Sequence, residues 1–255
     1  LAAAQEEFSE DGVQVIGPSL EVAEACNDKW GTVEFLRAAG IRTPRTYLNP
    51  ESALKGIAAG DVQFPLMVKP RWGMGSIGLM QAEDADELGL LYEFACGRIF
   101  TSHLRPASLF EPEPAVLIQE RATGTEYGLD VLNNLNGEHV VTVAKRKLAM
   151  RGGETDIAIT EDRQDLRALG ARLGALLRHR GNLDVDVFVD GTDVSVLELN
   201  CRFGGGYPFT HAAGANFPAA ILSWLSGVEP DPHCLRARPD ITTLKAILPK
   251  ILRRE

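Results

Sequence analysis

The 255-residue sequence is poor in cysteine and lacks the spacings on which cysteine chemistry depends. Cys26, Cys96, Cys201 and Cys234 are scattered along the chain and form no CxxC pair, which argues against a zinc site and a disulfide framework. Such cysteines are typical of buried thiols in a reducing compartment, so we expect a cytoplasmic protein.

Long apolar runs and basic runs are also missing. No apolar stretch reaches about 18 residues, so no membrane-spanning helix is expected, and the N-terminus lacks the basic-then-apolar order of a signal peptide. The formal net charge is −9, which argues against nucleic acid or an anionic membrane as a partner. The remaining composition, 45% hydrophobic and 24% charged, is typical of a soluble globular protein.

The predicted elements mix helices with antiparallel hairpins. Hairpin signals at Asn136-Gly137 and around Asp190-Gly191-Thr192 favour an α+β fold over a continuous βαβ winding. Helices are predicted over about 20–27, 27–40, 51–59, 84–100, 161–179 and 216–226, with strands between them. Residues 1–18 suggest a helix end followed by a short strand, VQVIG. They cannot form a core alone, so they either pack on a later segment or end an N-terminal α/β unit.

A glycine loop, GMGSIG at residues 73–78, matches the dinucleotide-binding pattern G-x-G-x-x-G only in its letters. That fingerprint requires a strand directly before the loop and a helix after it, whereas four residues intervene here and LMQ predicts a strand. We therefore interpret the loop as a hairpin flap whose backbone N–H groups approach phosphates, with an ordinary turn as the alternative. Lys69 ends an apolar strand just before the flap and requires solvent or an anion, which favours nucleotide phosphates.

Two neighbouring strands, LDVDVFV and DVSVLELN, carry acidic side chains among apolar ones. Alternation places Asp184, Asp186 and Phe188 on one face, and Val194, Val196, Glu198 and Asn200 on one face of the next strand. A two-residue loop at Asp190-Gly191 separates Asp186 from Glu198, whereas a three-residue loop pairs them directly, so an odd connection is expected. Two paired carboxylates with Asn200 would suit Mg²⁺; a solvated polar edge is the alternative.

The order of these motifs carries a resemblance to a known family. A lysine in a helix precedes VKPRWGMGSIG, LIQERATGTEYGLDV, LDVDVFV and VLELNCRFGGGYP. From about Asn27 to about Pro230 the chain resembles the ATP-grasp superfamily, especially carbamoyl phosphate synthetase large-chain halves and carboxylate–amine ligases. The resemblance implies two α+β lobes that clamp ATP: a remnant of a Rossmann-like unit at 1–18, a small lobe with the flap at 19–114, and a large lobe with the metal site at 115–255.

The resemblance also implies a role for individual residues. Lys29 and Lys69 would hold ATP phosphates, Gly73, Gly75, Ser76 and Gly78 would form the flap, Gln119 and Glu120 would lie beside adenine, and Glu126 near the ribose. Asp186, Glu198 and Asn200 would bind Mg²⁺, with Mn²⁺ as the alternative, although many relatives carry glutamate where this chain has Asp186. Arg202 would face the reacting carboxylate. Lys147 and Arg151, with Lys145 and Arg146, would face the γ-phosphate or substrate.

The expected activity is an ATP- and Mg²⁺-dependent ligation. ATP would phosphorylate a carboxylate to an acyl phosphate, and an amine or similar nucleophile would displace the phosphate, mainly through positioning and charge neutralisation. The partners would be a small-molecule carboxylate and amine, with a homodimer left open. A nucleotide-binding module without ligase activity and a Rossmann-type NAD-binding oxidoreductase are the alternatives.

Overall fold

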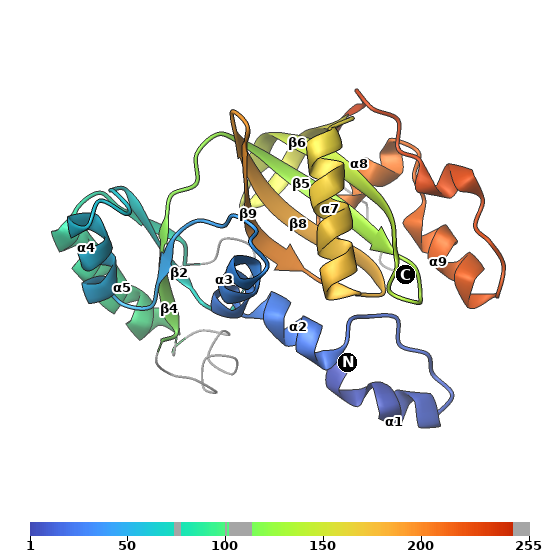
Figure 1. The fold of residues 1–255 in the computed structure, drawn as a ribbon, viewed down its shortest axis with the longest axis horizontal. Helices are drawn as coiled ribbons and strands as arrows, with labels where there is room; N and C mark the ends of the chain where they lie inside the picture. The colour runs from blue at the N-terminus through green and yellow to red at the C-terminus, as the bar shows by residue number, and fades with distance from the viewer. Residues whose placement is uncertain (74–77, 100, 102–113, 247–255) are drawn as a thin grey trace, which may run out of the picture.

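The computed structural model describes residues 1–73, 78–99, 101 and 114–246, and their strands form two antiparallel sheets (Figure 1). The smaller sheet has the order β1-β4-β2-β3, and the larger sheet has the order β10-β7-β6-β5-β8-β9. The strands are β1 (Thr46–Tyr47), β2 (Leu66–Pro70), β3 (Met80–Ala82), β4 (Val116–Glu120), β5 (Thr125–Asn133), β6 (His139–Arg151), β7 (Glu154–Glu161), β8 (Gly181–Asp190), β9 (Asp193–Asn200) and β10 (Thr242–Leu244). This architecture confirms the α+β class; β7 and β10 were not predicted.

The smaller sheet forms one lobe with helices α4 (Pro50–Ala58) and α5 (Ala85–Ile99) (Figure 1). Asn49 caps α4 by accepting a hydrogen bond from the Ser52 backbone at 2.8 Å, and Pro50 occupies the first turn, where its missing N–H costs nothing. Strand β4 pairs with β2 and so belongs to this sheet, although the sequence-based boundary at 114/115 assigns it to the other lobe. The boundary itself stays a prediction.

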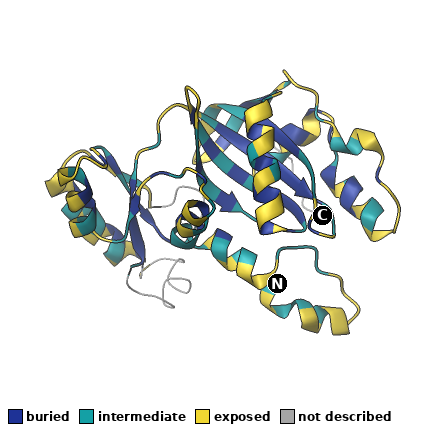
Figure 2. Ribbon diagram, in the orientation of Figure 1, coloured by how far each residue is buried: buried dark blue, intermediate teal, exposed yellow. Residues whose placement is uncertain are grey.

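The larger sheet presents two different faces because its side chains alternate. Odd-numbered apolar residues of β5 and β8, such as Leu129 and Val185, are fully buried beneath helix α7 (Gln164–Leu177), in one core cluster with Leu173 (Figures 1 and 2). Helix α7 approaches closely because Gly170 lies against the Thr142 side chain. The even-numbered residues face away from α7; among them, Glu126 and Asp186 face the smaller lobe, whereas Leu132 packs with Phe217.

Helices α2 (Leu20–Asn27) and α3 (Lys29–Ala38) precede the smaller sheet in sequence but pack on the larger one. Ser19 caps α2, which matches the helix expected over about 20–27, and Asp28 caps α3. The expected strand VQVIG is absent from the described residues, which show only helices η1 (Ala2–Ala4) and α1 (Gln5–Glu10) before α2. Arg180 instead donates to the Gly17 carbonyl at 3.2 Å and to Gln5 Oε1 at 2.8 Å, so this segment packs on a later part of the chain.

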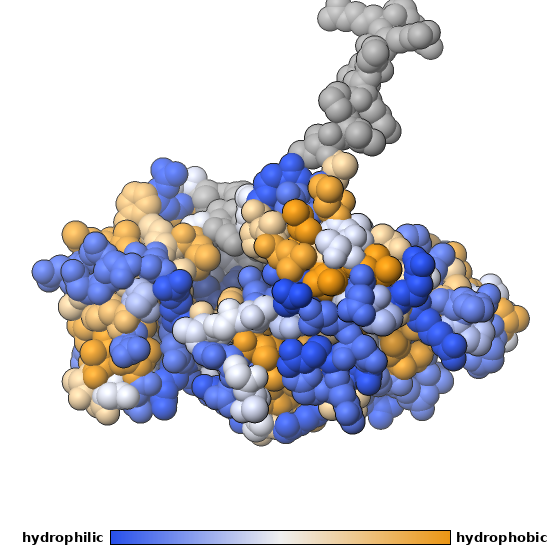
Figure 3. Space-filling model, turned by 90° about the horizontal axis from the view of Figure 1, so that it is seen from above, coloured by the Kyte–Doolittle hydropathy of each residue, from blue (hydrophilic) through white to orange (hydrophobic). Residues whose placement is uncertain are grey.

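Two further helices, α8 (Tyr207–Ala212) and α9 (Phe217–Leu225), and the short η2 (Pro232–Leu235) cover the end of the larger sheet. Phe217 and Ala215 anchor them by burial against Leu132 of β5. The surface seen from above alternates hydrophilic and apolar patches (Figure 3). Among the described helices, none combines the length and the hydrophobicity that crossing a bilayer requires.

Candidate functional site

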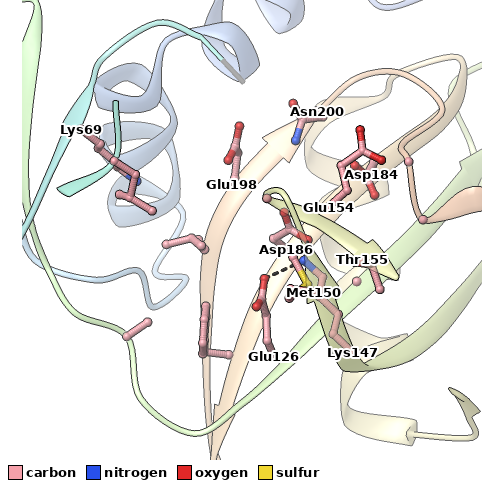
Figure 4. Close-up of a pocket in the computed structure, with 18 of the residues that line it drawn as sticks. Lys69, Glu126, Lys147, Met150, Glu154, Thr155, Asp184, Asp186, Glu198 and Asn200 are labelled. Carbon is pink, nitrogen blue, oxygen red and sulfur yellow. Dashed lines mark hydrogen bonds and ion pairs between the residues drawn. The ribbon is translucent and has the colours of Figure 1, made fainter. Parts of the chain in front are cut away.

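A cavity of about 570 Å³ lies between the two sheets. Met67 and Lys69 from β2 and Gln119 from β4 line its wall on the side of the smaller lobe. Strands β5, β6, β8 and β9 line the opposite wall, and Figure 4 shows Lys69 across an open space from Glu198 and Asn200. The cavity therefore collects the polar face of the larger sheet and the lysine of the smaller one.

Asp186 and Glu198 are direct cross-strand partners, and Asp184 and Asn200 form the next pair. The expected odd connection is wrong, however, because Asp190 pairs with Asp193 across a two-residue turn. The register shifts between Asp186 and Val187, where Val187 pairs with Val196 and leaves Leu197 as the extra residue of a β-bulge.

The bulge also corrects the expected face of β9. Val194 and Val196 pack with the core beneath α7, whereas Leu197, Glu198 and Asn200 line the cavity. The two valines therefore do not share a face with the two polar residues, contrary to the simple alternation. A bulge turns the strand by one residue, so two consecutive side chains, Leu197 and Glu198, face the cavity.

Lys147 of β6 is held between two carboxylates (Figure 4). Its ammonium donates to Glu126 Oε1 and to Asp186 Oδ1, each at 2.6 Å. Gly128 of β5 lies beside the Lys145 and Lys147 side chains, and an added Cβ there would stand 3.6 Å and 3.7 Å from their Cε atoms, at ordinary contact distance. Burial alone would lower the pKa of Lys147, but Asp186 and Glu126 outweigh that effect and raise it.

Lys69 and Lys29 supply positive charge to the other wall. Lys69 is 8% exposed and donates to Gln119 Oε1 at 2.7 Å, while Lys29 donates to the Gly73 carbonyl at the start of the predicted flap. Burial and the nearby Lys29 lower the pKa of Lys69 to about 8, and burial lowers the pKa of Lys29, partly offset by Glu198. Two neighbouring ammonium groups, one buried and one partly buried, are suited to an anionic ligand.

Arg202 follows the end of β9, beside an acidic row formed by Asp184, Asp186 and Glu198. It donates to Asn200 Oδ1 at 3.1 Å and to Asp184 Oδ2 at 3.4 Å. The Asp184 carboxyl packs against Gly204, where any side chain would collide with it, since an added Cβ would lie 2.1 Å from its carboxyl carbon. Burial and the neighbouring Asp186 raise the pKa of Asp184 to about 6.

A buried ion pair lies next to the acidic row. Lys145, which lines the cavity, pairs with Asp130, and both side chains are at most 2% exposed. Asn182 donates to the same carboxylate at 3.1 Å, and the Thr210 hydroxyl also donates to it. Sequence reasoning missed Asp130 and gave Asp184 no role; the alternation around both residues was the available signal.

The structure gathers most of the predicted site residues. Those that line the cavity are Lys29, Lys69, Gln119, Glu120, Glu126, Lys147, Asp186, Glu198, Asn200 and Arg202. Gly73 and Gly78 are described but do not line it, and Gly75 and Ser76 lie outside the described residues. Arg151 does not line the cavity either: it is half exposed and paired with Asp156 at 2.5 Å. The roles themselves stay predictions.

The oxygen donors of β8 and β9 fit a hard divalent cation. Asp186, Glu198 and Asn200 offer two carboxylates and an amide oxygen at one wall, a set that suits Mg²⁺ when phosphate oxygens complete its shell. The described residues contain no group of three or more His, Cys, Asp or Glu side chains placed to hold a metal. An ion at this site would therefore depend on Asn200 and on a bound phosphate.

Solved structures share the fold. The biotin carboxylase domain of Hydrogenobacter thermophilus 2-oxoglutarate carboxylase, solved with MgADP and bicarbonate, matches with a TM-score of 0.70 at 19% identity over 88% of this chain and 49% of that chain. Carboxyaminoimidazole ribonucleotide synthase from Aspergillus clavatus, complexed with ATP, matches with a TM-score of 0.67 at 17% identity over 93% and 60% of the two chains. The L-amino acid ligase of Bacillus licheniformis has a TM-score of 0.64 at 18% identity, over 87% and 54%.

Curated sequences give a consistent result. The carbamoyl phosphate synthase large chain of Thermus thermophilus is 26% identical over 234 residues, which cover 87% of this chain and 21% of that protein. The C-terminal section of the Aquifex aeolicus large chain is 24% identical over 224 residues, covering 85% of this chain and 40% of that protein. The chain thus spans less than half the length of either relative.

A family model assigns the chain more directly. The model, described as "ATP-grasp in the biosynthetic pathway with Ter operon", matches residues 112–246, more than half of the sequence. That range contains β4, the whole larger sheet and the acidic row of β8 and β9. Together with the shared fold, this match confirms the expected resemblance, and the chain belongs to the ATP-grasp family.

Proposed function

We propose that the protein is an ATP- and Mg²⁺-dependent ligase that activates a small carboxylate as an acyl phosphate for attack by an amine. One observation carries the proposal: two lysines lie across one cavity from a set of oxygen donors. The lysines are Lys29 and Lys69, and the oxygen donors are Asp186, Glu198 and Asn200. The two ammonium groups would neutralise phosphate charge, and the opposing oxygen donors would supply the metal site that phosphoryl transfer requires. A nucleotide-binding module without turnover is the second candidate.

The residues of this chain would divide the work between the two walls. Lys29 and Lys69 would bind and orient the phosphates, and Lys147, already between Glu126 and Asp186, would stand at the same acidic face. Asp186, Glu198 and Asn200 would hold Mg²⁺, which would neutralise charge on the transferred phosphoryl group. Arg202 would pair with the substrate carboxylate, since a guanidinium matches a carboxylate in both charge and shape.

The test measures nucleotide binding and turnover separately. Calorimetry with Mg-ATP gives affinity, and phosphate release is then followed with pooled carboxylates and amines, including amino acids and bicarbonate. Glu198→Gln should remove Mg-dependent turnover and cost little stability, because the neutral amide keeps the shape but no longer attracts the cation. Arg202→Ala should keep ATP affinity within about threefold and lose turnover by about 100-fold, the scale of one lost charge-stabilising group.

Arg151→Ala is the matched control. This arginine is half exposed, pairs with Asp156 and does not line the cavity, so its loss should leave both ATP affinity and turnover unchanged. Normal turnover of the Arg202→Ala protein would refute the assignment of that arginine. If the protein binds ATP but releases no phosphate with any of the carboxylates and amines supplied, the binding module would be favoured over the ligase.

A further inference from the structure

Two of the four cysteines meet beside the cavity, although 175 positions separate them in the sequence. The Sγ atoms of Cys26 and Cys201 lie 3.2 Å apart. Cys26 is 5% exposed, and Cys201 is partly exposed. A disulfide needs the two sulfurs at about 2.05 Å, so a relative approach of roughly 1 Å would join them.

Both cysteines border residues of the candidate site. Cys26 lies in the last turn of α2, three positions before Lys29, whose ammonium lines the cavity. Cys201 directly follows Asn200 and directly precedes Arg202, and both of these line the cavity as well. The sulfur pair therefore connects the end of α2, just before Lys29, to the end of β9, just before Arg202.

We propose that Cys26 and Cys201 form a reversible disulfide that reduces the activity of the neighbouring site. The oxidant would be a low-molecular-weight disulfide such as oxidised glutathione. The sulfur of the more exposed Cys201 would attack it and release one small thiol, and Cys26 would then attack the mixed disulfide and release the second. The two cysteines lose two electrons and two protons, which appear in the two released thiols.

The disulfide would lower activity by moving the neighbouring site residues, without changing their chemical groups. It would pull the end of β9 and the end of α2 together and hold them there. The Asn200, Arg202 and Lys29 side chains, which lie within three positions of the two cysteines, would move with them. Displacements near 1 Å cost catalysis about 100-fold when reacting groups must be aligned. This effect on activity rests on the proposed function, whereas formation of the bond rests only on the position of the two sulfurs.

The experiment treats the full chain with oxidised glutathione and reads three quantities: intact mass, cross-linked peptides and Mg-ATP affinity with turnover. The wild type should lose two hydrogens, about 2 Da, in a peptide pair containing Cys26 and Cys201. Turnover should fall by about 100-fold and return with dithiothreitol. Cys26→Ser should instead retain a glutathionyl adduct on Cys201, because the second thiol is missing.

Two control variants separate the pair from other thiols. Cys96→Ser/Cys234→Ser should behave as the wild type, and Cys26→Ser/Cys201→Ser should keep its turnover in oxidant. Absence of the Cys26–Cys201 peptide pair when Cys96 or Cys234 is already modified would overturn the proposal. A complete cross-link with unchanged affinity and turnover would overturn the regulatory role. If the reduced protein binds no ATP, both the proposed function and its regulation by the disulfide would be refuted. The peptide map would still show whether Cys26 and Cys201 form the bond.

Discussion

Replacing Lys145 by methionine tests whether the buried ion pair beneath the acidic row holds the larger lobe together. Asp130 is fully buried, and Lys145 is its only cationic partner among the ion pairs of the described residues. Methionine keeps the apolar stem but removes the charge, so the carboxylate would stay buried without a counter-ion. Breaking one partner of a buried pair costs about 3–5 kcal/mol. Because Asn182 and Thr210 still donate to Asp130, we expect about 3 kcal/mol.

Urea unfolding followed by circular dichroism measures this free energy directly. With a slope of about 2–3 kcal/mol per molar urea, the midpoint of Lys145→Met should fall by about 1 M or more. The double variant Lys145→Met/Asp130→Asn removes the stranded charge and should recover most of the loss. A single variant within about 1 kcal/mol of the wild type, or a double variant no more stable than the single one, would refute the reasoning.

Three further outcomes are expected. Gly170→Ala should destabilise by about 1–3 kcal/mol in thermal unfolding, because its Cβ would lie 2.2 Å from Thr142 Oγ1, whereas Gly89→Ala, with open space around it, should stabilise by up to about 1 kcal/mol. Burial lowers the pKa of His179 to about 4. Between about pH 6.5 and pH 4 the imidazole therefore gains a proton only in the unfolded chain, and the folded protein should lose about 3 kcal/mol of stability by pH 4. His179→Gln should lack this part of the pH dependence of unfolding. Lys69, with a pKa of about 8, should take up a proton when Mg-ATP binds near pH 8, as calorimetry in buffers of different ionisation heat would detect, and Lys69→Met should not.

Most elements of the fold could be predicted because their signals are local. The Ser19 cap, the prolines at helix starts and the strict alternation in LDVDVFV each act within a few residues. Strand β7 was missed because TDIAITE follows directly on the GG turn and precedes a helix, with little contrast to mark it. The VQVIG segment has strand propensity but no strand partner in the described residues, and propensity alone does not form a sheet.

The site was predictable in its composition and less so in its geometry. Alternation and motif order identified Asp186, Glu198 and Lys69, but the connection between β8 and β9 was wrong because a bulge has no distinct sequence signal. The Cys26–Cys201 contact was inaccessible for another reason. Long-range proximity depends on how α2 packs on β9, which no local pattern encodes.

The pairing of Asp186 with Glu198 can be reached in two ways: by a two-residue turn with the bulge at Leu197, or by a three-residue turn without a bulge. Adding one residue to the turn while deleting Leu197 would still place Glu198 opposite Asp186, since the two changes cancel in the strand register. The natural arrangement has the shorter turn and presents a leucine immediately beside the acid, whereas the variant has a longer turn and no such leucine. Comparing the two hairpins would therefore reveal what the bulge and its apolar residue contribute to a carboxylate whose cross-strand partner is unchanged.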